Sequence, residues 1–146
     1  MERRTFIKNS CLACLGTTLA AGLLPGCSSA YYAVVAYDAQ RLVVKKSEFL
    51  QIKKQQQLLR PFLVLKHEKV EFPIALYRIS DNEFVALYLQ CTHQGCEVRP
   101  HTTVLSCPCH GSEFDRKGEV LEGPAERALK QFPVQMDGEN IYVNLV

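Results

Sequence analysis

Two short loops contain most of the residues in this chain that could do chemistry. The first reads Cys91-Thr92-His93-Gln94-Gly95-Cys96, and the second reads Cys107-Pro108-Cys109-His110-Gly111-Ser112. Thiolate sulfur and imidazole nitrogen are ligands of zinc and of iron–sulfur clusters in proteins. The spacings Cys-x-His and Cys-x-x-His place a sulfur and a nitrogen on one side of each loop. Two such loops facing each other predict a four-coordinate metal centre with two cysteines to spare.

The spacing by itself leaves the identity of the metal open. A structural zinc site of Cys91, His93, Cys107 and His110 would be chemically sound. Such a site does not explain why each loop carries a further cysteine at a matching position. The additional pair favours a centre that is more specialised than structural zinc.

Both loops resemble the signature of the Rieske [2Fe–2S] proteins of the disulfide-containing, respiratory-complex-like type. Only Gln94 departs from the usual pattern, in which an apolar residue is common at that position. The resemblance covers about Leu89 to Leu129 and implies one [2Fe–2S] cluster. Carried over position by position, it implies one iron with thiolate ligands from Cys91 and Cys107, and a second iron with imidazole ligands from His93 and His110.

The resemblance also implies roles for residues around these ligands. Cys96 and Cys109 would form a disulfide that ties the two loops together. Ser112 matches a position whose hydroxyl hydrogen-bonds a cluster sulfide in high-potential members. Two residues later those members have a tyrosine that reaches a ligand sulfur, whereas this chain has Phe114. We therefore expect a lower reduction potential than in the high-potential respiratory proteins.

Two further properties follow from the same resemblance. Gly123 and Pro124 resemble the start of the proline-containing loop that covers the cluster in this family. The outer nitrogens of the imidazole ligands face solvent in the family, so electron transfer is expected to be coupled to proton transfer.

The elements that must position these loops are predicted to be strands. The chain has 146 residues, of which 47% are hydrophobic and 22% are charged, as in an ordinary globular protein. Short runs of β-branched and aromatic residues separated by turn-forming residues predict an all-β fold. The resemblance further implies small antiparallel sheets with an inserted cluster-binding subdomain of two loops, at about residues 89–129. The expected strands are Tyr31–Tyr37, Arg41–Lys46, Phe62–Lys66, Ile74–Ile79, Phe84–Gln90, Gln131–Gln135 and Ile141–Val146. Glu48–Leu59 is the one segment that could instead form a short helix.

The first 26 residues are predicted to be an export signal, with the Rieske domain at residues 27–146. Residues 3–8 resemble the twin-arginine signal, and the apolar stretch that follows, to about Pro25, is shorter than the roughly twenty residues of a membrane span. Leu24-Pro25-Gly26-Cys27 resembles a lipobox, which makes Cys27 a candidate for lipid attachment. Residues 1–26 contain three of the 17 basic residues and one of the 15 acidic ones, so residues 27–146 are formally neutral and no nucleic-acid partner is expected.

These features predict an exported electron-transfer protein, held at a bacterial membrane on its periplasmic side by the N-terminus. It would pass single electrons between a membrane quinol or periplasmic redox enzyme and an acceptor such as a cytochrome. The alternative is the Rieske subunit of a quinol–cytochrome c reductase, in which case the chain is part of an oxidoreductase. A structural Cys₂His₂ zinc module is a more remote alternative.

Overall fold

The computed structural model describes residues 30–146, and these form an all-β fold, which confirms the predicted class. All strand pairs are antiparallel except β1 with β6. The first sheet has the order β1(Tyr32–Ala33), β6(Phe62–Leu65), β7(Ile74–Arg78), β8(Phe84–Tyr88) and β13(Gln131–Phe132). The second has the order β14(Val134–Met136), β15(Asn140–Asn144), β3(Arg41–Lys45) and β2(Ala36–Asp38). The third has the order β12(Val120–Glu122), β11(Glu113–Asp115), β10(Val104–Ser106) and β9(Arg99–Pro100). A short 3₁₀ helix, η2(Lys46–Phe49), leads into a separate hairpin of β4(Leu50–Lys53) and β5(Gln56–Leu59).

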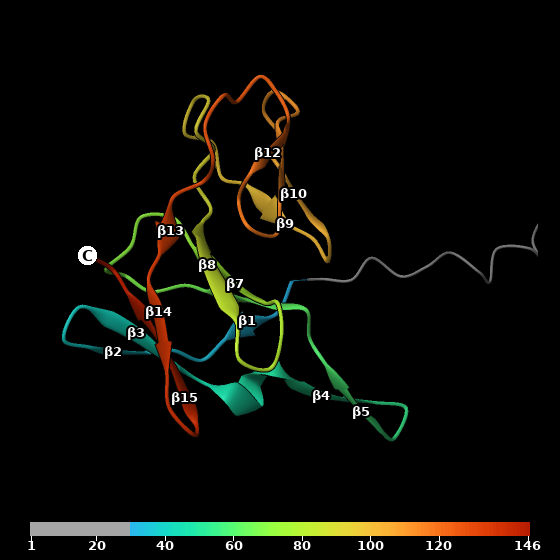
Figure 1. The fold of residues 1–146 in the computed structure, drawn as a ribbon, viewed down its shortest axis with the longest axis vertical. Helices are drawn as coiled ribbons and strands as arrows, with labels where there is room; N and C mark the ends of the chain where they lie inside the picture. The colour runs from blue at the N-terminus through green and yellow to red at the C-terminus, as the bar shows by residue number, and fades with distance from the viewer. Residues whose placement is uncertain (1–29) are drawn as a thin grey trace, which may run out of the picture.

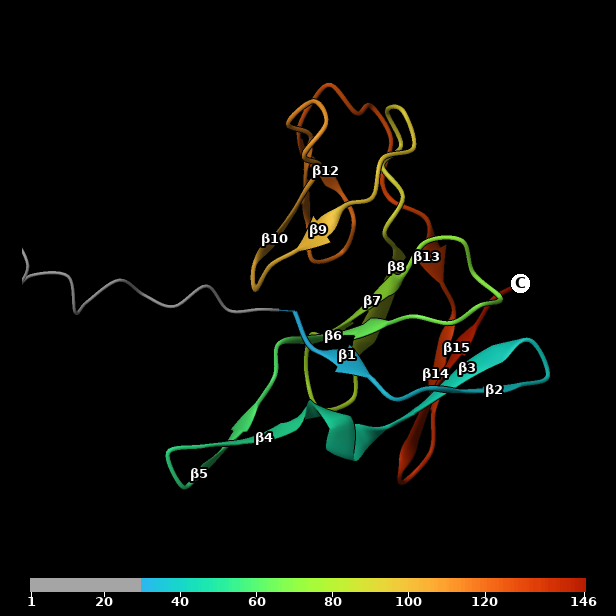
Figure 2. The same ribbon diagram turned by 180° about the vertical axis from the view of Figure 1, so that it is seen from behind.

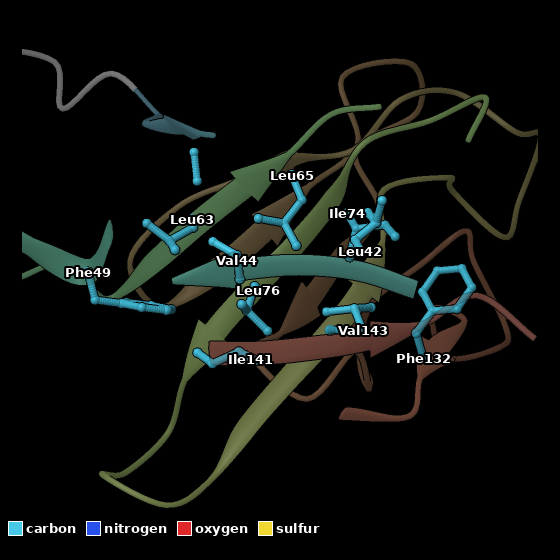
Figure 3. Packing of buried hydrophobic residues seen from close by; sticks show 12 residues of the cluster. Leu42, Val44, Phe49, Leu63, Leu65, Ile74, Leu76, Phe132, Ile141 and Val143 are labelled. Atoms are coloured by element: carbon cyan, nitrogen blue, oxygen red, sulfur yellow. The ribbon is translucent and has the colours of Figure 1, made fainter. Parts of the chain in front are cut away.

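The five-stranded sheet lies between the other two, and strand β7 shows why. Its first four residues, 74–77, are all buried without alternation, as expected for a strand that is covered on both faces. Ile74 and Leu76 pack into a core shared with the second sheet, which contributes residues such as Leu42 and Ile141 (Figure 3). Ala75 and Tyr77 point to the opposite face and join a second core.

The second core attaches the predicted cluster-binding subdomain to the five-stranded sheet. This subdomain follows β8 and precedes β13 in the chain, and it contains the third sheet. Leu105 and Phe114 from that sheet are completely buried against Tyr77 and Leu87 of the five-stranded sheet. Tyr77 adds a hydrogen bond, because its hydroxyl donates to the carbonyl of His101 at 2.7 Å. Burial raises the pKa of this phenol, which therefore stays protonated as a donor.

Close packing also explains a glycine at the base of the subdomain. Gly118 has φ of +84°, and a Cβ at this position would lie 2.8 Å from Leu87 Cδ2 and 3.3 Å from Leu129 Cβ. Any side chain would therefore separate β8 from the segment that returns to the five-stranded sheet. In Figures 1 and 2 the subdomain forms one end of the molecule, with three loops at its tip, and the β4–β5 hairpin lies toward the other end.

Several sequence expectations are wrong in detail. The strand expected at 31–37 is divided between β1 and β2, which belong to different sheets. The strand expected at 131–135 is divided at Pro133, which has no N–H to donate to a sheet. Residues 50–59 form a hairpin and not a helix, with Lys54 and Gln55 at positive φ in its two-residue turn. Strands β9–β12 were not expected, because each has only two or three residues.

The predicted export signal and Cys27 lie outside the described residues. Within residues 30–146 no helix is long and apolar enough to cross a membrane.

Candidate metal centre

The two cysteine–histidine loops adopt the same backbone conformation. In each loop the N–H of the first cysteine donates to the carbonyl five residues later, and the N–H of a glycine donates back to the carbonyl of that cysteine. Each glycine is in the left-handed region, with φ of +77° at Gly95 and +81° at Gly111. The bonds are Cys91 N to Cys96 O at 2.8 Å, Gly95 N to Cys91 O at 2.8 Å, Cys107 N to Ser112 O at 2.8 Å and Gly111 N to Cys107 O at 3.0 Å. The shared conformation presents one cysteine and one histidine from each loop.

Cys91 and Cys107 form the buried half of the centre. The two residues are 3% and 2% exposed, they belong to the second core, and neither is in a disulfide. Burial is the main cause that raises the pKa of the Cys91 thiol, and the neighbouring Cys107 side chain adds to it. The backbone N–H groups of His93 and Gln94 act in the opposite direction, since they donate toward the sulfur. A bound metal would hold both sulfurs as thiolates, and these N–H groups would stabilise that charge.

His93 and His110 form the exposed half. Their ring centroids are 5.1 Å apart, with an angle of 84° between the ring planes. Both residues are exposed, unlike the two cysteines. The four residues that the sequence selects therefore form two pairs, one of buried cysteines and one of exposed histidines. This donor set fits a [2Fe–2S] centre in which one iron has two thiolates and the other has two imidazoles.

The predicted disulfide is confirmed. Cys96 and Cys109 are bridged, with an S–S distance of 2.08 Å and a Cα–Cα distance of 6.5 Å. The bridge joins the first loop to the second, and its two sulfurs lie within 4.8 Å of the sulfur of Cys107. Since bridged sulfurs are not thiolate ligands, these three cysteines are not a metal-binding set in themselves. The bridge instead holds the two ligand loops together beside the centre.

Ser112 connects the second loop to the third loop, residues 123–129. Its side chain is completely buried, and its hydroxyl oxygen accepts a hydrogen bond from the backbone N–H of Ala125 at 2.9 Å. Within residues 30–146 this hydroxyl donates no hydrogen bond of its own. The geometry leaves its hydrogen for a group held between the loops. Gly123 and Pro124 are joined by a cis peptide bond and are exposed at the start of the third loop.

Phe114, two residues after Ser112, is completely buried in the same core as both free cysteines. Its ring offers no hydrogen-bond donor to them. This placement is consistent with the expectation of a lowered potential, which stays a prediction.

The sequence did not indicate that the first and third loops are joined by a side chain. The hydroxyl of Thr92 donates to the carbonyl of Arg127 at 2.6 Å. This contact places Arg127 next to the first ligand loop, and a pocket that Arg127, Lys130 and His93 help to line opens there. Basic residues in a polar loop carry no signal of such a role in the sequence, because solvated charges are common in loops.

Comparisons with known proteins agree with the donor set. The family model described as "Rieske [2Fe-2S] domain" matches residues 38–133, more than half of the chain. The iron–sulfur subunit of the cytochrome b6-f complex of Synechococcus sp. (strain JA-3-3Ab) is 40% identical over 70 residues, which are 44% of this chain and 41% of that subunit. A second iron–sulfur subunit of that complex, from Nostoc sp. (strain PCC 7120), is 43% identical over 56 residues, or 37% of this chain and 32% of that protein. The matches thus span less than half the length of these relatives.

Solved structures give the same result for the fold. The crystal structure of the cyanobacterial plasma membrane Rieske protein from Synechocystis PCC 6803 matches with a TM-score of 0.51 and 34% identity, over 57% of this chain and 86% of that one. A quaternary ammonium Rieske monooxygenase matches 81% of this chain and 32% of its own, with a TM-score of 0.53. Its identity is 16%, so this second match shows the fold alone. Family model, relatives and geometry together show that the chain belongs to the Rieske [2Fe–2S] domain family and holds one such cluster.

Proposed function

We propose that this protein is an exported, membrane-anchored electron carrier of the bacterial periplasm. It would pass one electron at a time between a quinol or a periplasmic redox enzyme and an acceptor such as a cytochrome. The observation that carries the proposal is the two-sided donor set, with two buried sulfurs and two exposed imidazoles. The two loops that supply these groups are joined by a disulfide. Electron transfer as such follows from family membership and from the relatedness to cytochrome b6-f iron–sulfur subunits.

In this proposal the four predicted ligands divide the work. Cys91 and Cys107 hold one iron inside the second core, and His93 and His110 hold the other at the surface. A [2Fe–2S] cluster with this ligand set takes up and releases one electron, at a higher potential than an all-cysteine cluster. The exposed rings leave their outer nitrogens open to a partner. A proton bound at either nitrogen can therefore accompany the electron.

The disulfide supports an oxidising compartment. Structural disulfides persist in the periplasm and are rare in the bacterial cytosol. The Cys96–Cys109 bridge and the twin-arginine-like residues 3–8 therefore favour the same side of the membrane.

The start of the described domain supports a carrier over a swinging subunit. The hydroxyl of Tyr31 donates to Glu48 Oε2 at 2.9 Å, and the guanidinium carbon of Arg60 lies 3.8 Å from the centroid of the tyrosine ring. The chain is thus attached to the domain from Tyr31 onward. If Cys27 carries lipid, residues 28–30 reach at most about 10 Å, which is too short for a large rotation of the domain.

A second candidate is the Rieske subunit of a quinol–cytochrome reductase. It is favoured by the two cyanobacterial relatives, which are subunits of the cytochrome b6-f complex. Purification from native membranes separates the two candidates. Two results together would favour the reductase subunit. The protein would be recovered with a b-type cytochrome, and deletion of its gene would abolish quinol-dependent reductase activity.

Electron paramagnetic resonance of the dithionite-reduced protein tests the centre itself. The expected result is a rhombic Rieske signal with two irons and two acid-labile sulfides per chain. A Cys91→Ser variant should lose the signal, whereas Cys96→Ser, which changes a bridged sulfur, should retain at least part of it. A silent sample with one zinc per chain would overturn the proposal in favour of the zinc module. Mass spectrometry of the mature N-terminus tests cleavage and acylation at Cys27.

A further inference from the structure

A solvent-open pocket of about 430 Å³ lies beside the first ligand loop. Cys91 and His93 contribute to its lining from that loop, and Arg127 and Lys130 contribute from the third loop and the segment that follows it. The pocket therefore extends from a predicted ligand of the buried iron to a predicted ligand of the exposed iron.

Two basic residues, Arg127 and Lys130, line the pocket, and no acidic residue does. Within residues 30–146 neither Arg127 nor Lys130 is in an ion pair. The Arg127 backbone is held by the Thr92 hydroxyl, and Lys130 Nζ lies 4.7 Å from the centroid of the Phe132 ring. Glu126 precedes Arg127 in the chain but does not line the pocket. Arg127 and Lys130 thus line the same pocket as His93, and no ion pair matches either charge within residues 30–146.

The positive pocket stands out from the charge of its surroundings. Residues 79–146 contain ten acidic and five basic residues, yet residues 27–146 as a whole are formally neutral. Arg127 and Lys130 are two of those five basic residues, so the pocket is a local positive site within an acidic segment, where it can select an acidic group of a partner.

We propose that this pocket binds a carboxylate from the acidic docking face of a redox partner protein. The inference rests on the proposed function, since it assigns the partner's chemistry at the same centre. With the carboxylate between Arg127 and Lys130, the partner's redox group lies on the side of His93. A cluster held by Cys91, His93, Cys107 and His110 would supply one electron to a haem partner, whose iron would go from Fe(III) to Fe(II) with no bond formed or broken.

Binding of redox-inert partners to the oxidised, cluster-loaded protein tests this proposal. The probes are two zinc-substituted c-type cytochromes, one with an acidic and one with a basic docking face. The test protein is the double variant Arg127→Gln, Lys130→Gln. The matched control is Lys53→Gln, Lys54→Gln, which removes the same charge from exposed residues at the tip of the β4–β5 hairpin. Calorimetric titrations give Kd at ionic strengths of about 20 mM and about 300 mM. The Debye length is longer than about 10 Å at the lower ionic strength and shorter than that at the higher one.

For the acidic cytochrome, the pocket variant should raise Kd about tenfold at low ionic strength, as expected for the loss of two exposed ion pairs. This difference should shrink to about twofold at high ionic strength, while the hairpin variant stays within about twofold of the wild type. The basic cytochrome should bind the pocket variant no more weakly than the wild type. Equal Kd values of all three proteins for the acidic cytochrome, or an equal loss in both variants, would overturn the proposal.

The paramagnetic signal separates this inference from the proposed function. If the wild-type protein shows the Rieske signal and all variants transfer electrons equally well, the proposed function stands and the pocket proposal is refuted. A wild-type protein without the signal refutes the function and the pocket together.

Discussion

Replacement of Ser112 by alanine should change both the stability of the domain and the potential of its centre. In the structure the Ser112 hydroxyl accepts from the Ala125 N–H at 2.9 Å, and both residues are buried, at 0% and 4% exposure. Alanine removes the acceptor and leaves a cavity too small to admit water easily. The Ala125 N–H would then be a buried donor without a partner. The hydrogen of the hydroxyl, which is not donated to any group within residues 30–146, would also be lost to the centre.

The two effects have different sizes and separate measurements. A buried unpaired N–H costs about 2 kcal/mol, which in a domain of this size lowers Tm by about 8 °C. A hydroxyl that donates to a reduced centre favours reduction by about 1 kcal/mol. Its loss should lower the one-electron potential by about 40 mV, because about 59 mV corresponds to a tenfold change in the equilibrium constant. Thermal unfolding followed by circular dichroism measures the first effect, and a redox titration followed by paramagnetic resonance measures the second.

Two matched variants make this result decisive. Ser112→Thr retains a hydroxyl and should recover most of the potential. Ser80→Ala removes an exposed serine whose hydroxyl accepts a longer bond of 3.4 Å from Asn82 N, and it should change neither quantity. A Ser112→Ala protein with an unchanged potential but a lowered Tm would refute the donation to the centre. An unchanged Tm would refute the structural role of the bond to Ala125.

Three other substitutions give independent tests. Phe114→Tyr should raise the potential by about 40 mV if its hydroxyl reaches a ligand sulfur, and an unchanged or lower value in the redox titration would contradict the assigned role. Joint replacement of Cys96 and Cys109 by serine removes a bridge with a sequence separation of 13. It should lower the free energy of unfolding, measured in denaturant titrations, by about 3 kcal/mol. Equal denaturation midpoints of the variant and the wild type would exclude a stabilising role of the bridge. The Asp137 carboxylate has a lowered pKa because it accepts from Tyr142, Asn140 and Glu139, so its stabilisation is complete above the unfolded pKa of about 4 and is lost as pH falls through the lower folded value. Asp137→Ala should therefore lower Tm at pH 7 but less so below pH 4, and a Tm difference that grows on acidification would contradict this sign.

The sequence by itself determined the candidate centre. Cys91, His93, Cys107 and His110 lie in two short motifs, and the geometry that presents them is local, because the hydrogen bonds within each loop span at most five residues. The resemblance of both motifs to one family also implied the Cys96–Cys109 bridge, which the structure confirms. The all-β class was predictable for a similar reason, since β-branched runs and turn residues are read over a few positions.

Tertiary structure decided how the elements join and what surrounds the centre. Residues 50–59 could have formed a helix, yet they pair as a hairpin whose root is held by Arg60, which donates to the carbonyls of Glu48 and Leu50. Strands β9–β12 are too short to show a pattern, and they exist because the third sheet packs on the second core. The Thr92–Arg127 bond joins residues 35 positions apart, and the cationic pocket depends on it. Such contacts leave no periodic signal in a sequence, because their energy comes from groups that meet only after the chain has folded.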